Sequence, residues 1–234
     1  MLRQPRIVVS VNLGAWPMMA AAVVETAIRA SIARSGTCHI MLTGGHTASR
    51  LYSHWAEKRS LPTESLRIFY GDERCVPSDH PDSNHGLVLR TLFADGRTNG
   101  CTIVHMRAGD PDRDEAARSY DALLPGSIDV LLLGVGSDGH IASLFPKDPA
   151  LLVKDRRVVK ATGPKAPFDR LTISPTVISH AKEVFLLATG AEKGRMLAQA
   201  LQVPWDIQSL PVRLTLDGTW LLDNEAEAAL INER

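Results

Sequence analysis

The chain has 234 residues, of which 44% are hydrophobic, and its 26 basic residues balance its 26 acidic residues. This length and apolar content are typical of a globular protein with a sizeable core, and we expect one α/β domain over residues 1–234. The balanced charge lacks the electrostatic signature of nucleic-acid or anionic-membrane binding, so we predict neither as a partner.

Cysteine usage and the N-terminal segment bear on the compartment. The three cysteines are odd in number and widely spaced, and they match neither disulfide nor metal-ligand spacing. The first apolar stretch is too short for a signal peptide, and the apolar run over residues 18–36 is interrupted by Glu25 and Arg29. We therefore predict no membrane span and a cytoplasmic location.

Short β-branched and apolar runs alternate along the chain with longer segments of helical periodicity. Such alternation is typical of parallel strands joined by crossover helices, and ligands of such sheets bind beyond the carboxyl ends of the strands. The predicted strands cover residues 6–11, 38–44, 66–72, 101–106, 128–134, 156–161, 170–174, 183–190 and 218–223. The predicted helices cover residues 17–34, 46–58, 112–124, 191–201 and 224–231.

The first strand end that carries candidate chemistry contains Gly44 and Gly45, which join a predicted strand to a predicted helix. Glycines let a ligand approach the backbone, and the free N–H groups at a helix N-terminus suit a phosphate. Thr47 adds a hydroxyl group in the first helical turn. An ordinary tight turn explains the same spacing equally well, and the Walker phosphate-binding motif is absent from the sequence.

Three charged residues, Asp72, Glu73 and Arg74, follow another predicted strand. A guanidinium group such as that of Arg74 suits a phosphate or carboxylate ligand. The two acids are suited to hold the Arg74 side chain or to act on a proton. A solvated loop is the alternative. The polar residues 79–85 predict a long connection, and we interpret its two histidines as loop residues because nothing else nearby has metal-ligand spacing.

Residues 128–140, IDVLLLGVGSDGH, contain the glycine pattern of a dinucleotide-binding motif. That motif requires a helix of several turns after the glycines, but Pro146 and Pro149 limit any helix here to about two turns. We therefore reject NAD as a cofactor. We predict a short helix with His140 in its first turn, where the helix dipole favours a neutral imidazole that accepts a proton. Asp138 is placed to cap that helix or to orient a substrate group; for the histidine, backbone hydrogen bonding is the alternative.

Two further cations lie near strand ends. Arg170 begins a predicted strand, and Lys193 lies in the first turn of the helix predicted over residues 191–201. A cation is unfavourable in a first helical turn, so we predict that Lys193 faces an anion there. An ordinary solvated lysine is the alternative.

Together these segments resemble the 6-phosphogluconolactonase family. The resemblance spans nearly the whole chain and rests on LTGGHTASRLY, FYGDERCVP followed by SNHG, IDVLLLGVGSDGHIASLFP, APFDRLTISPTVI, VFLLATGAEKGRML and WLLDNEAEAAL. It implies a single 6-phosphogluconolactonase domain over residues 1–234. The implied fold is α/β, a modified Rossmann-like three-layer α/β/α sandwich with a mostly parallel sheet, similar to glucosamine-6-phosphate deaminases, ribose-5-phosphate isomerases and CoA transferases.

The resemblance also implies an activity: hydrolysis of the δ-lactone of 6-phosphogluconate, the second step of the oxidative pentose phosphate pathway, without metal or cofactor. His140 is then the general base that activates water, Asp138 orients the substrate or His140, and Arg74 completes the catalytic set by holding an anionic group. The implied substrate- and phosphate-binding residues are Gly44, Gly45, His46, Thr47, Asp72, Arg170 and Lys193. The sequence leaves open which cation contacts the phosphate, and whether the chain is a monomer or a homodimer.

One loop departs from the family pattern, and two other functions compete with the lactonase. Residues 44–48 read Gly-Gly-His-Thr-Ala where the family usually has Gly-Gly-Ser-Thr-Pro, so the ring N–H of His46 replaces a hydroxyl donor. A glucosamine-6-phosphate deaminase would carry a glutamate in the segment occupied here by residues 143–146, SLFP. A non-catalytic sugar-phosphate sensor would carry a helix-turn-helix domain, for which the α/β pattern leaves no room. We therefore favour the lactonase.

Overall fold

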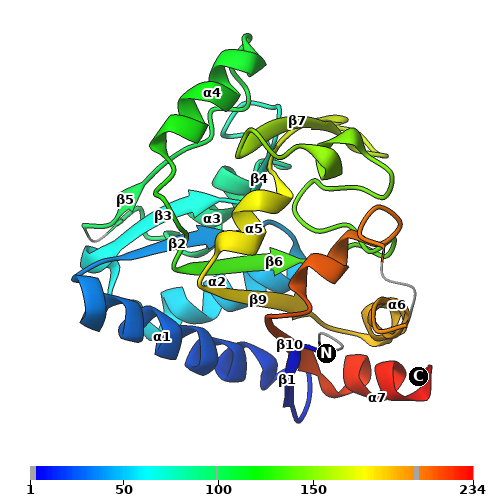
Figure 1. The fold of residues 1–234 in the computed structure, drawn as a ribbon. Helices are drawn as coiled ribbons and strands as arrows, with labels where there is room; N and C mark the ends of the chain where they lie inside the picture. Colours follow the sequence, from blue (N-terminus) through cyan, green and yellow to red (C-terminus); the bar gives the residue numbers. More distant parts are fainter. Residues whose placement is uncertain (1–3, 99, 203–205, 234) are drawn as a thin grey trace.

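The structure is a computed structural model that describes residues 4–98, 100–202 and 206–233. Seven strands form a sheet in the order β1-β10-β9-β6-β2-β3-β5, and every neighbouring pair is parallel (Figure 1). In that order the strands are β1 (Arg6–Ser10), β10 (Thr219–Asp223), β9 (Glu183–Ala188), β6 (Val130–Gly134), β2 (Cys38–Leu42), β3 (Leu66–Tyr70) and β5 (Thr102–Ile103).

The described residues also form seven α-helices. They are α1 (Trp16–Ser35), α2 (His46–Lys58), α3 (Asn84–Thr91), α4 (Arg113–Leu123), α5 (Pro175–His180), α6 (Ala191–Ala200) and α7 (Asn224–Asn232). Three short 3₁₀ helices are η1 (Thr63–Ser65), η2 (Pro149–Leu152) and η3 (Pro211–Thr215). Among the described residues, none of the helices is both long and apolar enough to cross a membrane.

The sheet separates two hydrophobic cores. One core joins side chains of α1, α2 and α3 to one face of the sheet, with Trp16, Trp55 and Leu51 fully buried. The other joins α4, α5, α6 and α7 to the opposite face, with Tyr120 and Trp220 among its buried members. Because strand side chains alternate between faces, the apolar runs at β2, β6 and β9 fill both cores. This arrangement confirms the predicted three-layer α/β/α fold.

A second sheet was not anticipated by the sequence interpretation. It contains β4 (Asp72–Arg74), β8 (Asp169–Ile173) and β7 (Val158–Thr162), and both of its strand pairs are antiparallel. The prediction of parallel pairing is therefore wrong for the segments at 156–161 and 170–174. The difference arises where the chain changes sheets at Gly71, because its N–H donates to the Leu42 carbonyl oxygen at 2.9 Å while its carbonyl oxygen accepts from the Ile173 N–H at 2.9 Å.

Other differences are local. The predicted single strand over 66–72 divides at Gly71, and the one predicted over 101–106 shortens to two residues. The polar connection predicted over 79–85 ends in α3, which begins at Asn84 after the N-cap Ser83. Helix α5 also lies outside the predicted elements.

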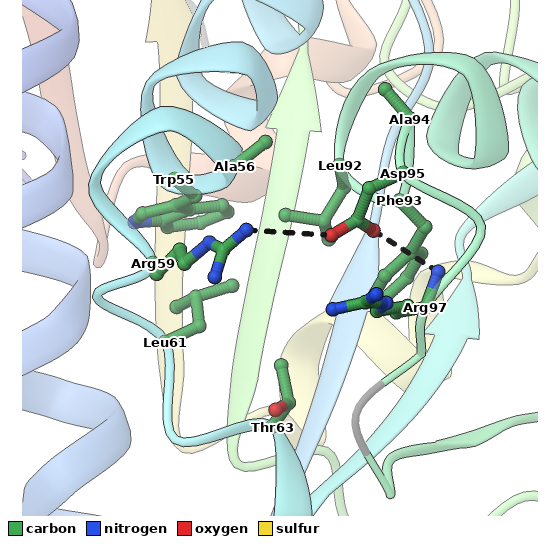
Figure 2. A pocket seen from close by; sticks show the side chains of 10 residues that line it. All are labelled: Trp55, Ala56, Arg59, Leu61, Thr63, Leu92, Phe93, Ala94, Asp95 and Arg97. Atoms are coloured by element: carbon green, nitrogen blue, oxygen red, sulfur yellow. Dashed lines mark hydrogen bonds and ion pairs between the residues drawn. The ribbon is translucent and has the colours of Figure 1, made fainter.

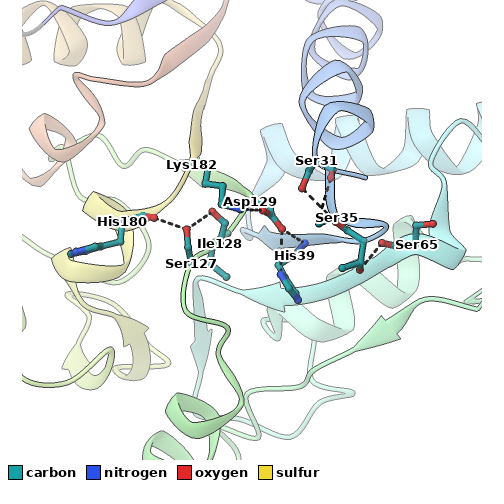
Figure 3. Close-up of polar contacts among 10 residues, drawn as sticks. Ser31, Ser35, His39, Ser65, Ser127, Ile128, Asp129, His180 and Lys182 are labelled. Carbon is teal, nitrogen blue, oxygen red and sulfur yellow. Dashed lines mark hydrogen bonds and ion pairs between the residues drawn. The ribbon is translucent and has the colours of Figure 1, made fainter. Parts of the chain in front are cut away.

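A polar cluster around the buried side chain of Asp129 lies at the amino ends of the central strands (Figure 3). Asp129, which directly precedes β6, accepts a hydrogen bond from the His39 backbone N–H at 2.8 Å and one from Lys182 Nζ at 2.7 Å. The His39 Nδ1 atom lies 3.2 Å from Asp129 Oδ2. We refer to Asp129 and His39 as the amino-end pair. These contacts tie β2, β6 and β9 together.

Candidate active site

The candidate active site is a pocket of about 330 Å³ at the carboxyl ends of β2, β6 and β9. The chain leaves β2 toward β3 and β5 on one side and returns to β6 on the other, so the pocket lies at a topological switch point of the sheet. The predicted site residues that line it are Gly44, Gly45, His46, Thr47, Asp72, Arg74, His140 and Lys193. Asp138 and Arg170 lie outside this lining.

A second hollow, of about 310 Å³, lies between the C-terminal ends of α2 and α3 (Figure 2). Arg59 and Asp95 face one another across it, with 3.9 Å between Nη2 and Oδ2. The Arg97 backbone N–H donates to Asp95 Oδ1 at 3.0 Å. This hollow lies away from the carboxyl ends of the strands and contains none of the predicted site residues, so it is not the candidate active site.

Asp138 and His140 form a hydrogen-bonded pair at the end of β6, which we call the carboxyl-end pair. Asp138 Oδ1 lies 2.6 Å from His140 Nδ1 and 3.2 Å from the His140 backbone nitrogen. The pair is partly open to solvent, with 31% of the His140 side chain and 42% of the Asp138 side chain exposed. Because the Asp138 carboxylate accepts a hydrogen bond from Nδ1–H, the other ring nitrogen, Nε2, is the one available to accept a proton.

The predicted short helix at His140 is wrong, and with it the roles of the helix dipole and of an Asp138 cap. Residues 135–144 form a tight loop with isolated antiparallel bridges between Val135 and Ile141 and between Ile141 and Leu144. Gly139 and Ala142 have φ values of +80° and +49°, which a right-handed helix does not permit. The histidine tautomer is therefore set by a carboxylate and not by a helix.

Gly136 is required beneath the carboxyl-end pair. A Cβ atom at this position would lie 2.1 Å from His140 Nδ1 and 2.5 Å from Asp138 Oδ1. The Gly136 N–H also donates to the His140 carbonyl at 2.9 Å. The middle glycine of the apparent dinucleotide-binding pattern thus makes room for the Asp–His contact.

The electrostatic state of Asp138 suits this contact. Its partial burial alone would raise the pKa of Asp138, but the hydrogen bonds from His140, and the positive charge of that ring whenever it is protonated, hold the pKa below its ordinary value. The carboxyl group is therefore ionised near neutral pH. The His140 ring also packs against Phe145, with 4.7 Å between the ring centroids, so the ring is held from two sides.

The glycine loop, Gly44–Thr47, forms another wall of the pocket. Helix α2 begins directly after Gly45, which has a φ of +96°, and no side chain caps the helix among the described contacts. Thr47 Oγ1 lies 3.1 Å from Thr189 Oγ1, which places the loop beside the end of β9. Lys193, in the first turn of α6, lines the same pocket as predicted. Two helix N-termini and one ammonium group therefore face this region.

Arg74 and Arg170 are paired across β4 and β8 in the second sheet. Arg74 lines the pocket and donates from Nη1 to the Asp82 carbonyl oxygen. Arg170 is 8% exposed, and its buried Nη1 has no hydrogen-bond partner among the described residues. Burial lowers the pKa of Arg170, and the neighbouring charge of Arg74 lowers it further. Two guanidinium groups held this close favour an anion beside them.

Sequence reasoning missed the role of Glu73, which it offered only as a partner for Arg74 or a proton carrier. Glu73 is 1% exposed and accepts hydrogen bonds from the backbone N–H groups of Arg74, Asn84 and His85 at 2.7–2.8 Å, and from Ser83 Oγ at 2.9 Å. Burial raises the pKa of Glu73 against these hydrogen bonds. The carboxyl group anchors the start of α3 to β4. The local signal for this helix is Ser83, a favoured N-cap residue.

His85 is likewise not a loop residue. It lies in α3, where its Nδ1 is 2.7 Å from Tyr70 Oη and its ring stacks on His105 with 4.2 Å between centroids. Burial, assisted by His105, lowers the pKa of His85 to about 4, so the ring is neutral near pH 7. No group of three or more potential metal ligands occurs in the part of the chain that the structure describes.

Comparison with known proteins identifies the family and confirms the fold. Residues 15–221 match the family model described as glucosamine-6-phosphate isomerases/6-phosphogluconolactonase. The chain is 35% identical to a 6-phosphogluconolactonase from Synechocystis sp. over 95% of this chain and 97% of that protein. It is also similar to the 6-phosphogluconolactonase structure from Trypanosoma brucei, with 29% identity, a TM-score of 0.81 and coverage of 97% of this chain and 99% of the other.

A monomeric glucosamine-6-phosphate deaminase shares the fold, with a TM-score of 0.78 at 20% identity over 96% of this chain and 99% of the other. This likeness confirms the predicted structural relation to such deaminases and carries no further weight. The family match and the curated relatives together cover nearly the whole chain. The chain belongs to the glucosamine-6-phosphate isomerase/6-phosphogluconolactonase family.

Proposed function

We propose that this chain, a lactone hydrolase by family and by its relatives, converts 6-phospho-D-glucono-1,5-lactone to 6-phospho-D-gluconate with water activated by His140. The relatives named 6-phosphogluconolactonase support the substrate. The observation that carries the mechanism is the 2.6 Å contact between Asp138 Oδ1 and His140 Nδ1 at the pocket. It leaves Nε2 of His140 as the proton acceptor.

In the proposed reaction, His140 Nε2 takes a proton from water as the water oxygen attacks the lactone carbonyl. Asp138 holds the opposite ring nitrogen and stabilises the imidazolium that forms. The tetrahedral intermediate then expels the ring oxygen, which receives the proton back from Nε2. General-base assistance of this kind contributes about 10²–10⁴-fold, which suffices for an activated ester without a covalent nucleophile.

The rest of the pocket supplies charge for an anionic substrate. The glycine loop, with His46 and Thr47, and Lys193 on α6 form the proposed phosphate-binding region. Arg74 lies on the β4 side of the pocket and Arg170 beside it, where they hold the phosphate or the developing oxyanion. Asp72 accepts from Ser143 Oγ at 2.7 Å and so links β4 to the His140 loop. The mechanism uses no metal ion or cofactor.

The two hydrophobic cores share one sheet, which supports the proposal that residues 1–234 act as one domain. The proposed reaction is compatible with either a monomer or a homodimer.

The experiment that tests this function is hydrolysis of freshly prepared 6-phosphoglucono-δ-lactone near neutral pH, measured against spontaneous hydrolysis. Glucosamine 6-phosphate is assayed in parallel for ammonia release. We expect enzyme-dependent lactone loss without ammonia. Ammonia release would identify a deaminase instead, and phosphosugar binding without turnover of either compound would identify a sensor.

A further inference from the structure

Asn84, the first residue of α3, connects two walls of the pocket that are distant in the sequence. Its Nδ2 donates to the Asp72 carbonyl oxygen at 2.8 Å and to Asp72 Oδ1 at 3.1 Å. Its side chain also lies against Gly44, because a Cβ atom at position 44 would be 1.9 Å from Asn84 Oδ1 and 2.6 Å from Cγ. Asn84 is 1% exposed, so this link between β4 and the glycine loop is shielded from solvent.

The orientation of the Asn84 amide follows from its neighbours. Both Asp72 atoms in contact are oxygens, so the NH₂ group must face them and Oδ1 must face Gly44. Oδ1 is buried and has no hydrogen-bond partner among the described residues. An unpartnered buried carbonyl costs free energy, so stability alone does not explain an asparagine here.

Asn84 is itself held from behind. Its backbone N–H donates to Glu73 Oε1 at 2.7 Å, while Ser83 and His85 donate to Glu73 Oε2 at 2.9 and 2.8 Å. These hydrogen bonds need only the backbone of residue 84. Substitution of the Asn84 side chain therefore leaves α3 anchored and removes only the contacts to Asp72 and Gly44.

We propose that Asn84 is a positioning residue that sets the spacing between the glycine loop and β4, and hence between the two pocket walls that hold the substrate. The identity of that substrate rests on the proposed function, whereas the contact itself does not. Asp72 remains tied to the His140 loop through Ser143 when Asn84 is changed. In the variant, His140 therefore keeps its position, while the glycine loop and β4 are no longer held at their normal spacing.

The first test is the kinetics of Asn84→Ala on the lactone. We expect KM to rise about tenfold or more and kcat to change by less than about threefold, because misplaced binding groups weaken substrate binding without removing the base. Circular dichroism and the urea midpoint check folding, and Asn84→Ser replaces the alanine variant if that variant does not fold. An unchanged KM, or a fall in kcat alone, overturns the proposal.

The sharper test is a double-mutant cycle between Gly44→Ala and Asn84→Ala. Gly44 does not have a positive φ, and the three atoms nearest to a Cβ there all belong to Asn84. We expect Gly44→Ala to lower kcat/KM about 100-fold in the parent and less than about threefold in the Asn84→Ala background. Equal losses in the two backgrounds overturn the proposal.

Gly45→Ala provides the matched control. Gly45 has a φ of +96° and nothing within 4 Å of a Cβ, so alanine is strained there by the backbone alone. We expect Gly45→Ala to lower kcat/KM by the same factor in the parent and in the Asn84→Ala background. If Gly45→Ala were rescued by Asn84→Ala as well, the coupling would be nonspecific and the proposal would fail.

Calorimetric binding of inorganic phosphate to the same variants separates this proposal from the proposed function. If the parent hydrolyses no lactone, the proposed function fails, and the phosphate cycle still tests Asn84. We expect Asn84→Ala to weaken phosphate binding and Gly44→Ala to have little further effect in that background. Independent effects of the two substitutions, or no phosphate binding by the parent, overturn the positioning role.

Discussion

One Asp–His pair lies near each end of strand β6, and the two pairs have opposite surroundings. In the amino-end pair, Asp129 is 4% exposed in its side chain and receives hydrogen bonds from the His39 backbone and from Lys182. In the carboxyl-end pair, both side chains are at least 31% exposed, and His140 supplies both hydrogen bonds to Asp138. The same chemistry is a structural link where its hydrogen bonds are satisfied by the fold. It becomes a candidate catalytic unit where one ring nitrogen faces a pocket.

The largest expected effect is that of His140→Ala. We expect kcat to fall about 10²–10⁴-fold, since the variant lacks the general base. The free energy of unfolding should change by less than about 1 kcal/mol because the ring is partly exposed. Stopped-flow or pH-stat assays, together with urea unfolding, measure both quantities. A near-normal kcat would show that His140 is not the general base, and the two Asp–His pairs would then not differ in catalytic role.

Asp138→Asn should have the next largest effect. The amide oxygen still accepts the Nδ1 proton, but the negative charge that stabilises the imidazolium is lost. A hydrogen bond to a charged group is worth about 1.5–3 kcal/mol, which corresponds to a loss of about 10- to 100-fold in kcat. KM should change little. A rise in KM without a fall in kcat would show that Asp138 binds substrate and does not orient His140.

Asp129→Asn reverses the pattern. We expect the free energy of unfolding to fall by about 1–3 kcal/mol, because the His39 backbone N–H and the Lys182 ammonium group lose the charge of a buried acceptor. We expect kcat to stay within about twofold of the parent, because the amino-end pair lies at the opposite end of β6 from the pocket. Urea midpoints and lactone kinetics on the same preparation measure both. A large fall in kcat without a fall in stability would contradict the division of roles.

The smallest expected effect is the change with acid pH in the contribution of Asp129 to the free energy of unfolding. Burial alone would raise the pKa of Asp129, but the hydrogen bonds from Lys182 and from the His39 backbone hold it below its ordinary value. An ionised carboxylate with a lowered folded-state pKa stabilises the fold above about pH 4 and loses that contribution as the pH falls through the folded-state value.

The stability difference between the parent and Asp129→Asn should therefore narrow from pH 6 to pH 3, as followed by urea unfolding. Asp138→Asn is the matched control, because the pKa of Asp138 is also lowered but its side chain is far more exposed. Its difference from the parent should be smaller at every pH. If the stability difference changed more with pH for Asp138→Asn than for Asp129→Asn, the carboxyl-end pair and not the amino-end pair would be the stabilising one.

The sequence predicts the main sheet well because the relevant signal is local. The apolar runs at β2, β6 and β9 and the periodicity of α2 report burial directly, and the structure confirms these elements. The pairing of β4 with β8 was not predictable in this way, because Arg74 and Arg170 meet only through tertiary contacts.

Most of the predicted site residues line one pocket, but the sequence did not predict the local geometry there. The sequence motif selected Asp138 and His140, yet the predicted helix is absent because the loop closes through bridges and positive-φ residues. Glu73 and Asn84 were undervalued because their importance depends on which buried groups they contact. Contacts of this kind connect distant segments, and no spacing in the chain reports them.

The meeting of two helix N-termini, Lys193 and Arg74 at one pocket has a consequence for encounter kinetics. The chain as a whole is neutral, so the positive potential is local and extends about one Debye length, roughly 8 Å at physiological ionic strength. A phosphomonoester, nearly doubly charged at neutral pH, is steered only over the last part of its approach. Added salt should therefore slow association and lower kcat/KM while kcat stays constant, which makes the enzyme's capture of dilute substrate sensitive to ionic strength although its turnover is not.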